Sequence, residues 1–159
     1  MLKTPMTILG HRTLSEELQR LKTVERRRVA QAIEVARAHG DISENAEYDA
    51  AKNEQGLLEA KITDIEGKLA TAQVIDISTL SGETIIFGAT VTLLDMDSDE
   101  TKKITIVGED ESNVEKGLIS FSSPLARGLI GKSVGDFVTV TLPSSTKEYE
   151  VQSVEFKYF

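Results

Sequence analysis

The densest group of side chains able to do chemistry is acidic and lies between residues 41 and 49. Asp41, Glu44, Glu47 and Asp49 fall within these nine residues. Magnesium prefers oxygen ligands, and proteins usually hold it with one or two carboxylates plus water and substrate phosphates. Asp41 and Glu44 are three apart, so both can point the same way at the start of a helix. Two carboxylates make only part of a site, so a Mg²⁺ ion bound here would need its other ligands from a partner.

The same two residues also fit a purely structural role. Asp-x-x-Glu at a helix start is a capping box, and carboxylates near a helix amino terminus are stabilised by its dipole. One residue can cap the free protein and bind metal in a complex. Spacing alone therefore favours the capping interpretation, and the two interpretations are compatible.

Other charged groups could have a function, but each also fits a simpler structural role. The run Arg26-Arg27-Arg28 is either a solvated helix face or a docking site for an acidic surface or RNA phosphate. His39 fits a surface position in a last helical turn, where a cation is favoured. The acidic stretch Asp95 to Glu100 lacks the twelve-residue calcium-loop pattern, so it is predicted to be a charged hairpin turn.

The elements around the acidic group are predicted to be two long helices. Apolar residues after it recur in alternating steps of four and three, which is typical of a helix packed in a coiled coil. They are Tyr48, Ala51, Leu58, Ile62, Ile65, Leu69 and Ala72, and the polar Gln55 occupies the one remaining position of the stripe, between Ala51 and Leu58. This stripe predicts a helix from Ser43 to Val74, about 30 residues or roughly 45 Å long, with Asp41 or Ser43 as its cap.

A matching stripe precedes the acidic group but changes phase. Its first part is Leu14, Leu18 and Leu21, and its second part is Val29, Ile33 and Ala36. We therefore expect a break between Val24 and Arg28, with helix again to Ala38. Gly40 suits the left-handed residue that ends a helix. Such a short connection makes the two helices antiparallel.

From about residue 81 the pattern changes to that of strands. Strands are predicted at 89–94, 103–107, 118–121, 137–142 and 148–156, with a short helix at 124–130 capped by Ser123. Four or five antiparallel strands with one helix give an α+β fold. The predicted domains are a helical hairpin, residues 1–76, and a β-rich domain, residues 77–159.

Composition excludes several classes of protein. The chain of 159 residues has a net charge of -8, which argues against broad binding to nucleic-acid phosphates. It has no cysteine, which excludes disulfides and thiolate chemistry and suits a reducing cytoplasm, where we place it. With only two histidines, a histidine zinc site is not expected. No apolar run approaches the roughly 18 residues of a membrane span.

These residues resemble the GreA/GreB family of bacterial transcript cleavage factors. The resemblance is carried by Ala36-Arg37, then His39-Gly40-Asp41-Ile42-Ser43-Glu44-Asn45-Ala46-Glu47-Tyr48, by Pro5-Met6-Thr7 with Gly10, and by the segments 86–91 and 123–132. It covers essentially the whole chain, and the acidic balance is closer to GreA than to GreB. One departure is Arg27, where the family often has a proline that breaks the first helix.

The resemblance implies a transcription elongation factor and not an enzyme in its own right. A second, FKBP-like domain is then expected to dock on RNA polymerase while the coiled coil enters the secondary channel. Asp41 and Glu44 would help to hold a Mg²⁺ ion shared with the polymerase, which cleaves the 3′ end of backtracked RNA. Arg37 and Lys52 would lie near that RNA end. No tightly bound metal is expected in the free protein, which should be a monomer.

Three other functions fit parts of the sequence. An FKBP-like domain suggests prolyl isomerase activity, but that pocket is normally walled by aromatics, and the chain has no tryptophan and only 5% aromatic residues. A homologue that only blocks the channel would be expected to alter the pair Asp41 and Glu44, which is retained here. A generic coiled-coil adaptor leaves the acidic crowding unexplained.

Overall fold

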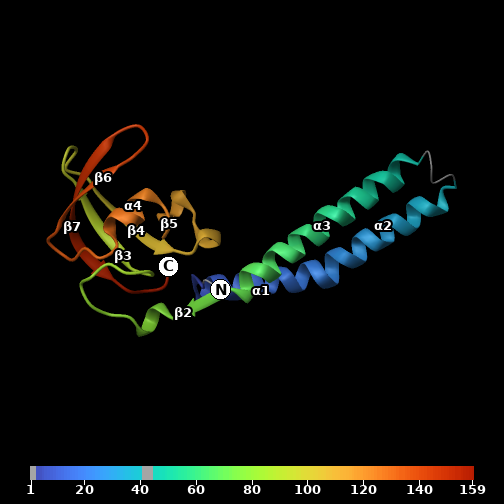
Figure 1. Cartoon of the computed structure of the whole chain (residues 1–159), viewed down its shortest axis with the longest axis horizontal. Coiled ribbons are helices and arrows are strands. Elements are labelled where there is room, and N and C mark those ends of the chain that lie inside the picture. The colour runs from blue at the N-terminus through green and yellow to red at the C-terminus, as the bar shows by residue number, and fades with distance from the viewer. Residues whose placement is uncertain (1–2, 41–44) are drawn as a thin grey trace. The chain divides into compact units, whose positions relative to one another are not determined.

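The computed structural model describes residues 3–40 and 45–159, and the chain forms two compact units. One unit is His11–Ala72, which is helical. The other combines Lys3–Gly10 with Gln73–Phe159 and contains the β-sheets and a short helix (Figure 1). The predicted α+β class, a helical hairpin followed by a small β-sheet domain with one short α-helix, is confirmed.

The helical unit is an antiparallel pair. The first arm comprises α1 (Ile8–Arg20), the π-helical turn η1 (Leu21–Glu25) and α2 (Arg26–Ala38), and the second is α3 (Ala46–Ala70). Ion pairs between the arms run in opposite order along them: Lys22 with Glu66, Arg26 with Glu59 and Arg28 with Glu54. Figure 1 shows α2 and α3 side by side, as predicted.

The predicted apolar stripes form the contact between the arms. Leu21, Ile62 and Ile65 are buried together, with four partly buried leucines packed around them, namely Leu14, Leu18, Leu58 and Leu69. Nearer the end of the hairpin, Val29, Ile33 and Ala51 form a second buried cluster. The hydrophobic effect acts along this whole line, so the arms are held together by burial and not by helix propensity alone.

The predicted break in the first arm is the π-helical turn η1. Leu21 and Val29 both face α3, although they are eight residues apart and not seven. A π-helical turn takes in one extra residue, which restores the apolar face after the shift. The break therefore lies at Leu21–Glu25, slightly before the predicted Val24–Arg28.

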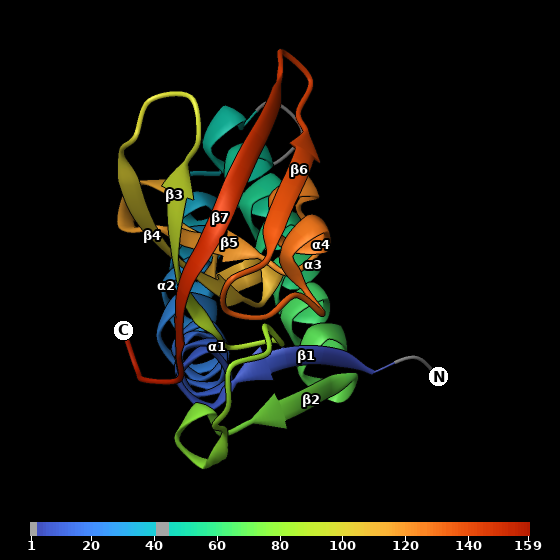
Figure 2. The same cartoon turned by 90° about the vertical axis from the view of Figure 1, so that its left-hand side faces the viewer.

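The second arm is shorter than expected. The 25 residues of α3 span about 37 Å. Residues Ala72–Ile75 form strand β2, which pairs with β1 (Thr4–Thr7) in a two-stranded sheet (Figure 2). The predicted extension of the helix to Val74 is therefore wrong, because this β-branched segment finds a strand partner at the beginning of the chain.

The main sheet has five strands, in the spatial order β5-β4-β3-β7-β6 (Figure 2). They are β3 (Thr90–Asp95), β4 (Thr101–Val107), β5 (Leu118–Ser120), β6 (Phe137–Thr141) and β7 (Thr146–Glu155). The strand β5 pairs parallel to β4, so the expectation of a fully antiparallel sheet is wrong. Two 3₁₀ turns, Glu109–Glu111 and Val114–Lys116, carry the chain across between these strands in place of a tight hairpin.

The one short helix closes the core of this sheet. In α4 (Pro124–Leu129), the Ser123 hydroxyl accepts a hydrogen bond from the backbone N–H of Ala126 at 3.3 Å, as expected for the predicted cap. Ala126 and Leu129 are completely buried with Val138 and Val140. The helix thus covers the end of the sheet where β6 lies.

The acidic stretch between β3 and β4 is a hairpin turn, as predicted. The Asp95 carboxylate accepts hydrogen bonds from the backbone N–H groups of Asp97, at 2.9 Å, and Ser98, at 3.3 Å. These bonds, that of Asp97 first, keep the pKa of Asp95 below its ordinary value. Its charge therefore stabilises the turn.

The first helix has a capping box completed by a distant residue. The Thr7 hydroxyl accepts a bond from the backbone N–H of Gly10 at 3.0 Å, which makes Thr7 the N-cap. A capping box normally takes its carboxylate from the third helical position, but that position is Gly10. Glu111 supplies it instead, accepting from the Thr7 backbone N–H at 2.9 Å and from the Thr7 hydroxyl. A Cβ on Gly10 would fall on the Glu111 side chain.

Replacing Glu111 with Ala should destabilise the protein by about 1–3 kcal/mol, because the buried Thr7 loses its carboxylate partner. Urea denaturation followed by circular dichroism measures this change. Glu115→Ala, at an exposed position on the neighbouring 3₁₀ turn, is the charge-matched control and should stay within about 0.5 kcal/mol of wild type. Equal stability of the two variants would refute the role of Glu111.

Candidate functional site at the end of the hairpin

Asp41 and Glu44, the predicted site residues, lie outside the described residues, as do Ile42 and Ser43. The structure describes the two helix ends that flank them. Helix α2 ends at Ala38 and α3 begins at Ala46. The contacts between these two ends therefore define the frame on either side of the acidic segment.

Asn45 ties the two helix ends together. Its side-chain oxygen accepts a hydrogen bond from the Tyr48 backbone N–H at 3.1 Å, so Asn45 is the N-cap of α3. Its side-chain nitrogen donates to the carbonyl oxygen of Ala36, in the last turn of α2. One donor partner and one acceptor partner fix the orientation of the amide. The predicted cap, Asp41 or Ser43, is wrong: the N-cap of α3 is Asn45.

The end of α2 is closed as predicted by Gly40. The backbone N–H of His39 bonds to the Ala36 carbonyl at 3.2 Å, and that of Gly40 bonds to the Arg37 carbonyl at 3.3 Å. Gly40 has a φ of 108°, a conformation that residues with a Cβ rarely adopt. Gly40 therefore ends α2 with a backbone conformation that suits glycine.

Two further contacts bridge the helix ends. The His39 Nδ1 lies 3.0 Å from a carboxylate oxygen of Glu47. The Arg37 guanidinium lies over the Tyr48 ring, 5.9 Å from its centroid, within the range of a cation–π interaction. Glu47 thus has a partner of its own. Asp49, the other flanking acid, is exposed in the first turn of α3.

The two predicted RNA-proximal residues lie on different arms. Arg37 is exposed in the last turn of α2 and stacks on Tyr48. Lys52 is exposed on α3, and its Nζ donates to the Gln55 side chain at 2.9 Å. The structure does not join them in one cluster, and their role near RNA stays a prediction.

The triple-arginine run is largely occupied within the hairpin. Arg26 makes two hydrogen bonds, each 2.9 Å, to the Glu59 carboxylate of α3. Arg28 bonds to Glu25 at 2.9 Å and also contacts Glu54. Among the described residues, Arg27 alone of the three forms no ion pair. These contacts favour a structural role over a free docking surface.

The residues that frame the site could be found only in part from sequence. Asn45 carries a signal, since asparagine is among the best N-cap residues, but Asp41 and Ser43 nearby are equally good candidates. In the part of the chain that the structure describes, no three His, Asp or Glu side chains come together in a metal-binding arrangement. The donor set of Asp41 and Glu44, two carboxylates, suits Mg²⁺ chemically.

Family comparisons divide the chain between two models. Residues 4–74 match the model described as transcription elongation factor, N-terminal, and residues 80–156 match that of transcription elongation factor, GreA/GreB, C-terminal. The two matches together span nearly the whole chain. None of the helices within residues 3–40 and 45–159 has the length and apolar content needed to cross a membrane.

Individual relatives are similar along nearly their full length. The chain is 55% identical to the transcription elongation factor GreA of Maricaulis maris over 154 residues, which covers 97% of this chain and 98% of the relative. It is 53% identical to that of Alkalilimnicola ehrlichii over 157 residues, or 98% and 99% of the two chains. Among solved structures, the GreA factor homolog 1 of Thermus thermophilus is 28% identical, with a TM-score of 0.43 over 96% of this chain and 99% of its own.

Proposed function

Because this chain belongs to the GreA/GreB family of transcription elongation factors, we propose that it binds bacterial RNA polymerase and stimulates cleavage of backtracked RNA. The helical hairpin enters the secondary channel and delivers the segment that connects α2 to α3 to the active site of the polymerase. Removal of the displaced 3′ end then returns an arrested complex to elongation. The factor supplies ligands, and the polymerase supplies the remaining catalytic machinery.

A single observation carries this proposal: the acid-rich segment connects the ends of two antiparallel helices that are buried against each other along their length. With α3 about 37 Å long, the hairpin has the reach to carry that segment through a deep channel. The contacts made by Asn45, His39 and Arg37 hold the two helix ends together. Such an arm is suited to present ligands at its end, and we propose that the sheet domain docks on the polymerase.

Asp41 and Glu44 are the residues that would hold the shared Mg²⁺ ion. The ion supplies activation of a water molecule for phosphodiester hydrolysis when it is bound in the complex. When ionised, the two carboxylates only accept hydrogen bonds, so they would also orient water, ammonium or guanidinium groups nearby. Arg37 and Lys52, one on each arm, add positive charge near the emerging RNA end.

RNA cleavage in a stalled, backtracked elongation complex tests the proposal. We expect the chain to accelerate release of short 3′ fragments and to restore elongation, whereas the chain without polymerase should leave the same RNA intact. Two carboxylates offer too few ligands for a productive metal site alone. No acceleration in the complex, or RNA degradation without polymerase, would contradict the proposed function.

A further inference from the structure

The first arm of the hairpin departs from regular α-helix at its π-helical turn. Residues Leu21–Glu25 interrupt the regular α-helical hydrogen bonding between α1 and α2. The Thr23 hydroxyl donates to the Gln19 carbonyl at 2.7 Å, so a side chain satisfies part of the altered backbone. The turn is needed because it brings Val29 back to the face that packs on α3. If the end of the hairpin is to keep a fixed position, this turn must therefore be held in one geometry.

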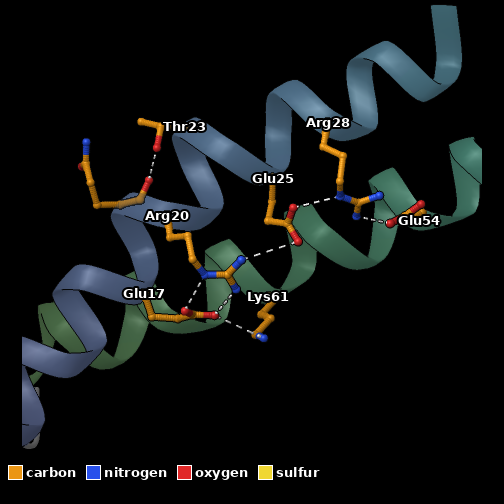
Figure 3. A network of polar contacts seen from close by, with 8 residues as sticks. Glu17, Arg20, Thr23, Glu25, Arg28, Glu54 and Lys61 are labelled. Atoms are coloured by element: carbon orange, nitrogen blue, oxygen red, sulfur yellow. Dashed lines mark hydrogen bonds and ion pairs between the residues drawn. The ribbon is translucent and has the colours of Figure 1, made fainter. Parts of the chain in front are cut away.

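A continuous chain of alternating charges crosses the turn, and we name it the ion-pair strap (Figure 3). Its members in order are Lys61, Glu17, Arg20, Glu25, Arg28 and Glu54. The first and last members are on α3, and the four between them follow the first arm through the π-helical turn. The strap thus connects α1, before the turn, and α2, after the turn, to the same helix α3. Through these contacts α3 bridges the turn.

Glu25 is the centre of the strap. It is the last residue of the π-helical turn, and its carboxylate lies between an arginine before the turn and one after it. The Arg28 Nε donates to Glu25 at 2.9 Å, and an Arg20 nitrogen lies 3.6 Å from the other carboxylate oxygen. The Glu25 side chain is 24% exposed, less than the 52% of Arg28, so it is partly shielded from water.

Arg28 joins two carboxylates with a geometry that a lysine at the same position would not fix. Its Nε bonds to Glu25 on the first arm while a terminal nitrogen contacts Glu54 on α3. The rigid guanidinium fork fixes the angle between these two bonds, whereas a lysine ammonium is a point charge on a flexible stem. Arg28 therefore sets both the turn and its distance from α3.

The hydrogen bond from Arg28 keeps the pKa of Glu25 below its ordinary value, and the bond from Arg20 does the same for the pKa of Glu17. Both carboxylates are therefore fully charged near neutral pH. Exposed ion pairs contribute little to global stability one by one. Their effect here is on geometry. Several hydrogen bonds and ion pairs in series restrict the directions in which the π-helical turn can bend.

We propose that Glu25 and Arg28 are positioning residues that lock the π-helical turn and so hold the far part of the hairpin steady. The inference rests on the proposed function, because a hairpin with a fixed shape matters only if its end must be placed accurately at the active site of the polymerase. It also assigns Arg26 and Arg28 to the hairpin itself and not to nucleic-acid binding. Only Arg27 of the run then remains outside these contacts.

Distances between spin labels on either side of the turn measure the lock directly. The chain has no cysteine, so Glu16→Cys with Glu34→Cys places labels at two exposed positions about 27 Å apart along the arm. We expect a narrow distance distribution in the otherwise wild-type protein. Glu25→Gln and Arg28→Gln should each broaden the distance distribution about twofold. Arg28→Lys should give a width between those of the wild type and Arg28→Gln. Arg27→Gln is the matched control and should leave the width unchanged. Unchanged widths in both Gln variants would overturn the lock.

Cleavage assays at saturating factor test whether the lock serves positioning. Arg28→Gln should lower the maximal cleavage rate about threefold to tenfold, while its affinity for the polymerase stays within about twofold of wild type. Arg27→Gln should match wild type in both. A broad distribution with a normal cleavage rate would overturn the positioning role. If the wild-type chain itself fails to stimulate cleavage, the proposed function fails, and the distance measurements still decide whether the turn is locked.

Discussion

Asp41→Asn, or Glu44→Gln, is expected to lower the stimulated rate of RNA cleavage by on the order of a hundredfold. A metal ligand at the reacting phosphate is worth several kcal/mol of transition-state stabilisation, and about 2.7 kcal/mol corresponds to a hundredfold in rate. Each substitution keeps the shape and an acceptor oxygen of the side chain but removes its charge. Extra Mg²⁺ should recover part of the lost rate, because the weakened site fills at higher concentration. The measurement is the rate of fragment release from a backtracked complex.

Binding and stability separate this effect from a structural one. Both variants should still compete with the wild-type chain for polymerase, since docking is proposed to use the sheet domain. Their unfolding free energies should change by less than about 1 kcal/mol, because Asn45 and not either acid caps α3. Glu34→Gln, an exposed glutamate on α2, is the charge-matched control and should cleave normally. Wild-type rates for both tip variants would remove the metal role.

The helical hairpin could be predicted because its information is local and repeated. The stripe that includes Leu58, Ile62 and Ile65 recurs over several turns, so its one polar member, Gln55, does not obscure it. The change of phase between Leu21 and Val29 also predicted a break in the right region. What the spacing did not specify was its form, since a kink, a loop and a π-helical turn all shift the phase of a stripe by about one residue.

Long-range pairings could not be predicted in the same way. Strand β1 is four residues long and its partner β2 begins at Ala72, so no local pattern connects them. The parallel pairing of β5 with β4 also depends on how the chain crosses over, and alternation of side chains is the same in either direction. The carboxylate of Glu111 reaches Thr7 across 104 positions of sequence. Such contacts arise from the folded sheet and leave no signature in either segment.

At the candidate site the acidic residues could be proposed from the sequence, whereas the contacts that frame them could not. The acids were found from residue type and spacing, and the resemblance gave them a role. The tie made by Asn45 was missed because three residues of the same segment are suitable caps. The partner of its second bond, the Ala36 carbonyl, is a backbone group that every residue possesses. An amide that caps one helix through its oxygen and bonds to another helix through its nitrogen can be recognised only when the positions of both helix ends are known.

Asn45 is therefore the residue outside the acidic pair whose replacement should affect cleavage most. Asn45→Ser keeps a side-chain oxygen able to cap α3, since serine and asparagine are similar N-caps, but its shorter side chain cannot also reach the Ala36 carbonyl. We expect this variant to retain stability within about 0.5 kcal/mol of wild type and yet to lose roughly tenfold in maximal cleavage rate, about 1.4 kcal/mol of transition-state stabilisation.

Asn45→Ala removes both bonds, so it should show the same loss of cleavage and also a loss of about 0.5–2 kcal/mol in unfolding free energy. Asn53→Ser, an exposed asparagine two turns along α3, is the matched control for both measurements. The comparison distinguishes the two bonds of one amide: capping is measured by stability, and the tie between the arms by the cleavage rate at saturating factor. If Asn45→Ser cleaves like wild type while Asn45→Ala does not, the cap alone matters, and the bond to α2 has no part in the proposed presentation of Asp41 and Glu44 to a metal ion.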